Sequence, residues 1–219
     1  MLASLIPDPE QLIKVFGLLG IFAIVFAESG LLVGFFLPGD SLLFTAGAIA
    51  AGAFSEKGPL KGIDFNILVL LAGVFVAAVA GDQVGYLFGL KAGPSLFKRP
   101  DSRLFKQEHL EKAQGFFDRY GPKAIVLARF VPVVRTFCPI VAGAGKMNYP
   151  TFLRFNLLGG FLWGVGVTML GYVFGRIPWV SDNIEIALIA IVVISLLPVL
   201  IEVYRHRRAA KAEAADIVG

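Results

Sequence analysis

Charged residues and prolines interrupt two of the long apolar stretches in this sequence, and this feature limits its possible folds more than any other. Stretch 15–37 holds Glu28 and runs into Pro-Gly-Asp at 38–40, after which only 41–54 is apolar. Stretch 124–147 is interrupted at Arg129, Pro132, Arg135 and Pro139. Helices break at membrane depth only where protein or a water-filled cavity satisfies the freed backbone groups. Both stretches therefore predict re-entrant or broken helical hairpins.

Three further stretches are long enough to cross a bilayer without interruption. A transmembrane helix needs about 20 apolar residues, and 66–90, 152–175 and 184–204 meet this requirement. The whole chain is 57% hydrophobic and 16% charged, whereas soluble domains carry about 25% charged residues. The composition excludes a disordered chain and a soluble enzyme, and it predicts an integral membrane protein.

The two interrupted stretches resemble copies of each other. Three short motifs occur twice, in the same order. Phe-Leu-Pro at 36–38 matches Phe-Val-Pro at an offset of 94 residues, and Ala-Gly at 46–47 recurs at an offset of 96. Gly-Tyr-Leu-Phe-Gly at 85–89 matches Gly-Tyr-Val-Phe-Gly at an offset of 86. Chance similarity of apolar sequence is the competing explanation. A copy made of one hairpin and one full span crosses the membrane an odd number of times, so the second copy would be inverted. Inverted repeats with discontinuous helices are typical of secondary transporters.

These patterns predict an all-α integral membrane protein that forms a single membrane domain. It contains two inverted repeats, each a broken hairpin plus a transmembrane helix, followed by a C-terminal transmembrane helix. The expected parts are repeat 1 at 14–90, a linker at 91–123, repeat 2 at 124–176, and the last helix with its basic tail at 184–219.

The linker and the tail carry the positive charge of the chain. Residues 91–123 hold eight Lys and Arg against four acids, and basic flanks mark the cytoplasmic side of a membrane protein. We therefore expect the linker and the C-terminus to be cytoplasmic, whereas the side of the N-terminus stays open. Within the linker, 101–120 is expected to form an amphipathic helix that lies on the membrane surface or serves as a solvated connector.

Five ionisable residues lie where lipid would penalise them: Glu28, Asp40, Asp82, Arg129 and Arg135. Each is expected to cost about 2.5–3.5 kcal/mol at the centre of a lipid-exposed helix, so these groups must face the interior. We expect the two acids of the first hairpin to face the two arginines of the second. A salt-bridge set that only holds the hairpins together is the structural alternative, but buried pairs stabilise poorly compared with apolar packing.

The chemistry of these side chains indicates an anion site with a proton carrier. Guanidinium groups bind phosphate oxygens through a planar fork of donors, so Arg129 and Arg135 suit a phosphate. A buried carboxyl group can exchange protons, which suits Glu28 or Asp40. Asp82 is either a third functional group or a cap near the cytoplasmic end of its span, and Trp163 is expected to pack.

The composition excludes several other kinds of site. Nucleic-acid binding needs a basic face on a soluble module, which this chain lacks. The single cysteine and two isolated histidines indicate no metal site and no cofactor.

The interrupted stretches also resemble a known family. Phe-Ala-Glu-Ser-Gly at 26–30 and Phe-Leu-Pro-Gly-Asp-Ser at 36–41 resemble the first signature of the DedA family, within the SNARE-associated/VTT-domain superfamily. Residues 128–136, then Pro139 and Ala142-Gly143, resemble its second signature, and the similarity covers roughly 15–180.

The resemblance implies a transporter of the bacterial cytoplasmic (inner) membrane that flips lipids, such as undecaprenyl phosphate or a phospholipid, with proton or cation coupling. It also implies the site residues: Arg129 and Arg135 for the lipid phosphate, and Glu28 and Asp40 for coupling.

Two other functions remain open. Pro-Gly-Asp-Ser at 38–41 is similar to the Pro-Gly-x-Ser-Arg-Ser signature of polyprenyl-diphosphate phosphatases, but Leu42 stands where that signature has arginine. The other alternative is an assembly scaffold whose charged cluster only holds a homodimer together.

Overall fold

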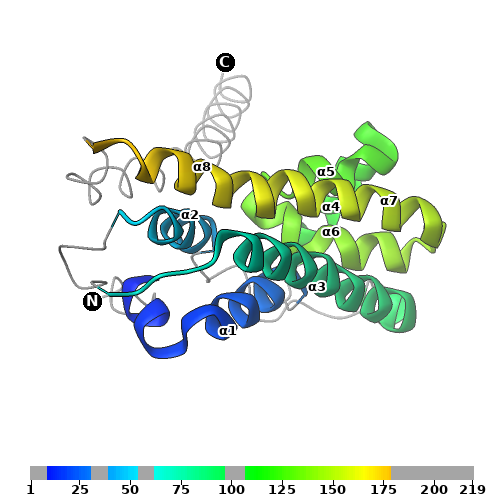
Figure 1. The fold of residues 1–219 in the computed structure, drawn as a ribbon. Helices are drawn as coiled ribbons and strands as arrows, with labels where there is room; N and C mark the ends of the chain where they lie inside the picture. The colour runs from blue at the N-terminus through cyan, green and yellow to red at the C-terminus, as the bar shows by residue number, and fades with distance from the viewer. Residues whose placement is uncertain (1–8, 31–38, 54–61, 97–106, 179–219) are drawn as a thin grey trace, which may run out of the picture.

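The described part of the chain is built from helices alone. The computed structural model describes residues 9–30, 39–53, 62–96 and 107–178, and these ranges contain no strand. The elements are α1 (Pro9–Gly30), α2 (Gly39–Ala50), α3 (Ile67–Leu96), α4 (Gln107–Tyr120), η3 (Gly121–Lys123), α5 (Ala124–Ala128), α6 (Pro132–Ala144), α7 (Tyr149–Gly160), η4 (Phe161–Val165) and α8 (Gly166–Gly175) (Figure 1). The all-α class is thus confirmed for this part. The predicted helix 184–204 and the basic tail lie outside the described residues.

Two helices are long and apolar enough to cross a membrane. They are Ile67–Gly93 within α3 and the continuous run Tyr149–Gly175, in which the π-helical turn η4 joins α7 to α8. Each has 27 residues, about 40 Å at 1.5 Å per residue, against a hydrocarbon core of about 30 Å. The predicted spans 66–90 and 152–175 are confirmed as apolar helices of spanning length.

The two long helices run antiparallel where they meet. A Cβ added at Gly160 would lie 2.9 Å from Val79, and one at Gly164 would lie 3.0 Å from Val74. The residue numbers of the contacts therefore rise along one helix and fall along the other. Because glycine has no side chain, the two helices approach closely at this crossing.

Helix α1 bends sharply at Gly17. The backbone there has φ 56° and ψ −147°, a conformation that is essentially restricted to glycine. The straight apolar part is Gly17–Gly30, which is shorter than a full span. It packs beside α3, where Gly30 and Gly81 are in backbone contact.

Helix α2 belongs to the first half of the chain but packs on the long helix of the second half. A Cβ added at Gly171 would meet the carbonyl group of Phe44, and one at Gly175 would lie 2.8 Å from the Cα of Ala48. Because both numbers rise together, α2 runs parallel to α8.

Helix α6 makes the reciprocal contact with α3. A Cβ added at Gly89 would meet the carbonyl group of Ile140, and one at Gly93 would lie 2.8 Å from the Cα of Ala144. Helix α6 is therefore parallel to α3. Each short helix is exchanged onto the long helix of the other half.

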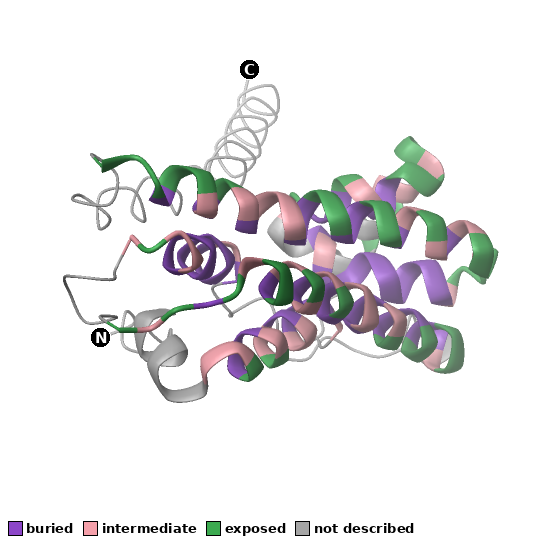
Figure 2. Cartoon of the chain, viewed as in Figure 1, coloured by how far each residue is buried: buried purple, intermediate pink, exposed green. Residues whose placement is uncertain are grey.

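The burial pattern suits a lipid environment. The short helices α2 and α6 are almost entirely buried between the long ones (Figure 2). The long helices expose large apolar side chains on their outer faces: Leu68, Val76, Leu87 and Phe88 on α3, and Leu158, Phe161, Leu170 and Phe174 on α7–α8. Such an extensive apolar exterior is unusual for a soluble monomer and typical of a membrane-facing surface.

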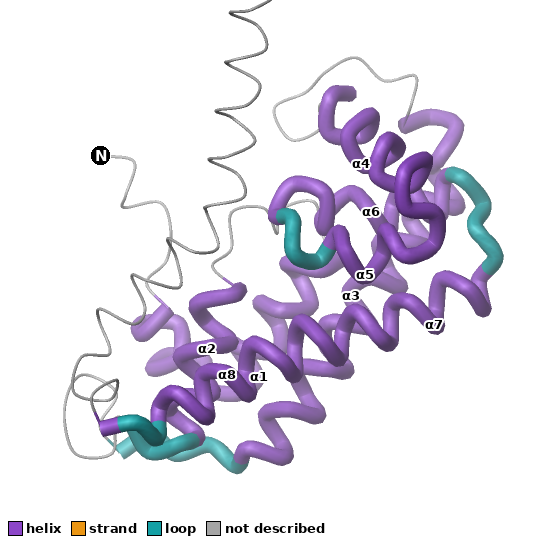
Figure 3. Tube along the Cα trace, turned by 90° about the horizontal axis from the view of Figure 1, so that it is seen from above, coloured by secondary structure: helices purple, strands orange, loops and turns teal. Residues whose placement is uncertain are grey.

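Helix α4 forms the C-terminal part of the predicted amphipathic helix 101–120 and ends at Tyr120, just before Gly121, whose φ is 55°. It lies at the far end of the molecule from α2, against α6 (Figure 3). Phe116 and Phe117 are half-buried against the core that surrounds α6, whereas Tyr120 is exposed. The predicted apolar face is therefore only partly covered by protein. The predicted start of this helix, 101–106, lies outside the described residues.

Candidate functional site

A proline positions both arginines of the second interrupted stretch. Val131 is extended, with φ −120° and ψ 104°, and Pro132 begins α6. Proline disfavours a helical conformation in the residue before it but suits the first position of a helix. The helical conformation is therefore interrupted between α5 and α6, as the sequence predicts. Arg129 lies at the end of α5, and Arg135 lies in the first turn of α6.

Arg135 lies between the two acids of the first half. Its Nη2 forms an ion pair with Oε1 of Glu28, and its Nη1 donates to Oδ1 of Asp40 over 3.1 Å. Glu28 lies in the last turn of α1, and Asp40 lies in the first turn of α2, where a carboxylate also complements the helix dipole. The expected meeting of these acids with an arginine is confirmed for Arg135. We call Arg135, Asp40 and Glu28 the outer cluster.

The close approach of α1 and α2 depends on a glycine. A Cβ added at Gly39 would collide with the carboxylate of Glu28. Because only glycine leaves this space open, the start of α2 can lie directly against the acid that pairs with Arg135.

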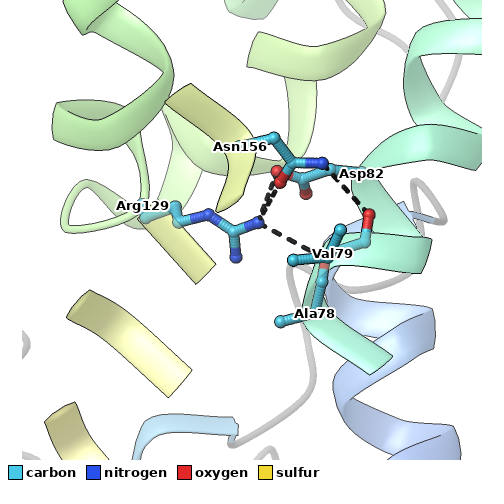
Figure 4. A network of polar contacts seen from close by, with 5 residues as sticks. All are labelled: Ala78, Val79, Asp82, Arg129 and Asn156. Atoms are coloured by element: carbon cyan, nitrogen blue, oxygen red, sulfur yellow. Dashed lines mark hydrogen bonds and ion pairs between the residues drawn. The ribbon is translucent and has the colours of Figure 1, made fainter. Parts of the chain in front are cut away.

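Arg129 forms a separate network deeper in the protein (Figure 4). Its Nη2 donates to Oδ2 of Asp82 over 2.6 Å, to Oδ1 of Asn156 over 2.7 Å and to the carbonyl oxygen of Ala78 over 3.3 Å. The amide nitrogen of Asn156 in turn donates to the carbonyl oxygen of Val79 over 3.1 Å. We call Arg129, Asp82 and Asn156 the inner cluster.

The inner cluster corrects two expectations. Arg129 does not pair with the acids of the first hairpin, because Asp82 lies opposite it on α3. Asp82 is not a cap near the end of its span: α3 extends to Leu96, which places Asp82 in the middle of the helix, where it is buried.

Trp163 connects the two clusters. Its indole Nε1 donates to Oδ1 of Asp40 over 2.7 Å. The guanidinium carbons of Arg135 and Arg129 lie 5.2 and 5.9 Å from the centre of its ring, within the range of cation–π attraction. The expectation that Trp163 only packs was therefore incomplete.

Access to the site is graded. The side chain of Asp40 is 28% exposed and that of Arg135 is 12% exposed, whereas those of Glu28, Arg129 and Asp82 are 5% exposed or less. A ligand that enters from outside the protein therefore meets the outer cluster first.

The ionised site has an odd charge count. Among the described residues, Glu28, Asp40 and Asp82 pair only with Arg129 and Arg135, so this set carries one net negative charge when fully ionised. One proton or one bound cation balances it. Among the described residues, no three His, Cys, Asp or Glu side chains form a group suited to a metal ion.

Sequence reasoning missed Asn156 and the polar role of Trp163. A polar amide within an apolar span, as at Asn156, is a usable signal because such a group needs a partner. For Trp163 the only signal was its place in a span among glycines.

Comparisons with known proteins identify a family model and several membrane proteins that are similar to this chain. The model of the VTT domain matches residues 37–173. The chain is 45% identical to protein DedA of Escherichia coli K12 over 194 residues, which is 89% of this chain and 85% of that protein. It is 47% identical to an uncharacterized membrane protein of Mycobacterium tuberculosis over 200 residues, 90% of this chain and 84% of that protein.

The chain is also 35% identical to the inner membrane protein YqjA of Escherichia coli over 158 residues, 72% of this chain and 67% of that protein. No solved structure matches.

Proposed function

This chain belongs to the DedA family of VTT-domain membrane proteins, and from this premise we propose that it flips a phosphate-bearing lipid across the bacterial cytoplasmic membrane. The observation that carries the proposal is an arginine, Arg135, held by two carboxylates inside a bundle whose outer faces are apolar. Undecaprenyl phosphate or a phospholipid would supply the anionic headgroup, and its tails would stay against the exposed apolar faces of the long helices.

Headgroup binding starts at the outer cluster. A phosphate presents several oxygens to a guanidinium fork, whereas Asp40 uses one oxygen for Arg135 and the same oxygen for Trp163. We expect the phosphate to displace Asp40 from Arg135. Arg129 would receive the phosphate further inside.

The odd charge count supports coupling to a proton or a cation. Oε2 of Glu28 is buried and has no hydrogen-bond partner among the described residues. Protonation of Glu28 or Asp40 would weaken the attraction of the acids for Arg135 and release this arginine to the lipid. Proton uptake would in this way bias the site between two arrangements.

The exchange of short helices supports an inverted repeat. On α2, Phe44 and Ala48 contact glycines of α8. On α6, the residues 96 positions later, Ile140 and Ala144, make the same kind of contact with glycines of α3. Because the long helices are antiparallel and each short helix is parallel to the long helix of the other half, a two-fold axis across the helices would relate the halves.

These contacts also adjust the alignment of the repeats. Gly89 and Gly93 occupy the places of Gly171 and Gly175, at an offset of 82 residues. In the proposed repeat, the helices would therefore align about one helical turn away from the offset of 86 given by the Gly-Tyr-x-Phe-Gly motifs.

The orientation of the chain can be tested with introduced cysteines. The positive-inside rule places α4 and the C-terminus in the cytoplasm, and the end of α8 would then face the periplasm. Cys138 is buried, so the native thiol gives little background. In whole cells, a membrane-impermeant maleimide should label Ile177→Cys and should spare Gln114→Cys. The reverse pattern contradicts the orientation.

The function itself is tested with purified protein in liposomes that contain undecaprenyl phosphate or a labelled phospholipid. Lipid movement should depend on the wild-type protein and should fall at least tenfold in Arg135→Ala, Arg129→Ala and Glu28→Gln. Arg154→Ala, which removes an exposed arginine of α7, is the matched control and should keep the wild-type rate. Wild-type rates in the three site variants refute the assignment.

The same assay separates the other two functions. Release of inorganic phosphate from a diphosphate lipid would favour the polyprenyl-diphosphate phosphatase instead. A protein that moves no lipid and runs as a homodimer would favour the scaffold.

A further inference from the structure

One aromatic side chain lies close to both the outer and the inner cluster. The indole of Trp163 is 3% exposed, touches Asp40 through its N–H group and lies within cation–π distance of both arginines. A side chain that only filled space would not need this donor. Its contact with the most exposed acid of the site is a polar one.

The backbone beneath Trp163 is unusual. Trp163 is the middle residue of η4, the π-helical turn Phe161–Val165. Such turns widen the helix by one residue and occur frequently at functional sites. The glycines on either side, Gly160 and Gly164, are pressed against α3. The turn therefore packs closely against α3, and its indole lies near both arginines.

The side chains of the site differ in exposure, and this difference indicates the order in which a ligand would reach them. Asp40 and Arg135 are the accessible members of the site, whereas Arg129 is buried with its partners. The indole donates a hydrogen bond to Asp40 and lies within cation–π distance of both Arg135 and Arg129.

We propose that Trp163 is a positioning residue that separates an outer anion site at Arg135 from an inner one at Arg129 and moves when the outer site is filled. The inference rests on the proposed lipid transport and adds a residue to it. An anionic headgroup at Arg135 displaces Asp40, the indole N–H loses its acceptor, and the ring turns away from Arg129. The headgroup then gains access to the inner arginine.

The fluorescence of Trp163 tests this movement directly. The chain has two tryptophans, so the Trp179→Phe variant reports Trp163 alone. Dioctanoyl phosphatidic acid should shift the emission of this variant and raise its quenching by acrylamide at least twofold. Dioctanoylglycerol, which lacks the phosphate, should do neither. An emission that does not respond to phosphatidic acid overturns the proposal.

Substitutions of the two arginines separate the outer site from the inner one. In the single-tryptophan protein, Arg135→Gln should abolish the fluorescence response. Arg129→Gln should keep the response but reduce lipid movement at least tenfold. A response that is lost in Arg129→Gln, or kept in Arg135→Gln, contradicts the order of the two sites.

Replacement of the indole tests its role in transport. Trp163→Phe keeps an aromatic ring but removes the donor to Asp40, and one hydrogen bond to a charged group is worth about tenfold in an equilibrium. We expect the rate at saturating lipid to fall about tenfold while the lipid concentration at half-maximal rate does not rise. A saturating rate that stays at the wild-type value, or a half-maximal lipid concentration that rises in a stably folded variant, would contradict this role.

The two proposals fail in different ways. If the wild-type protein moves no lipid but Trp163 responds to phosphatidic acid, only the transport function is refuted. If the protein moves lipid but the fluorescence of Trp163 does not respond to phosphatidic acid, only its role as a positioning residue is refuted. A ligand-free check applies in both cases: Asp40→Ala must change the emission of Trp163, because the indole then loses its acceptor.

Discussion

Removal of the Asp82 carboxylate should destabilise the protein strongly, because it leaves Arg129 charged and buried. In the native protein the guanidinium of Arg129 is 4% exposed and its charge is balanced by Asp82 at 2.6 Å. After Asp82→Ala, the acceptors of Arg129 that remain among the described residues are neutral, namely Asn156 and the carbonyl group of Ala78. Breaking a buried pair by removal of one partner costs about 3–5 kcal/mol. The remaining acceptors place the expected loss near the lower end, at about 3 kcal/mol.

A double variant separates the stranded charge from lost packing. Asp82→Leu combined with Arg129→Met removes both charges and keeps the volume apolar. Because apolar replacement of a buried ion pair is often neutral or stabilising, this protein should recover most of the stability lost in Asp82→Ala. It should still fail to move lipid, since Arg129 is absent.

The measurement is the free energy of unfolding of the purified protein in bicelles or mixed micelles, from a reversible denaturation curve. Asp118→Ala on α4 is the control: within the described part of the chain this exposed carboxylate accepts only from Gln114, one turn away, and its removal should cost less than about 0.5 kcal/mol. A loss below about 1 kcal/mol in Asp82→Ala, or a double variant no more stable than the single one, would refute this reasoning.

Three smaller changes test other parts of the structure. Gly39→Ala places a methyl group against Glu28; we expect a loss of about 1–3 kcal/mol, read from thermal melting, and slower lipid movement. Tyr86→Phe removes the hydrogen bond from the phenol to the Met147 carbonyl at 2.5 Å and should cost about 1 kcal/mol in a denaturation curve. Lys146→Gly relieves a left-handed backbone with φ 52° and should add about 0.5–1 kcal/mol, seen as a higher Tm.

The sequence predicts the long helices and the charged residues of the site well, for a simple physical reason. Lipid requires about 20 apolar residues for a span, and it penalises each charge inside one. Glu28, Asp40 and Arg135 stand out from their apolar surroundings on this basis, and the structure brings these three together.

The partners within the site were less predictable, because they depend on how the helices meet. Sequence spacing did not show that α3 continues to Leu96, so it placed Asp82 too near an end. The contact between Trp163 and Asp40 joins residues 123 positions apart. It also depends on the π-helical turn, which no local sequence pattern predicted.

The exchange of α2 onto α8 has a consequence for synthesis of the protein. Helix α2 ends at Ala50, but its partner is complete only at Gly175. At a bacterial rate of up to about 20 residues per second, the ribosome needs roughly 6 s or more to supply that partner. Until residues 135 and 163 have been synthesised, the charged Asp40 also lacks Arg135 and Trp163, so the insertion machinery or a chaperone must shelter the newly made segment. A chain truncated before α8 should therefore be a substrate for membrane proteolysis rather than a stable half.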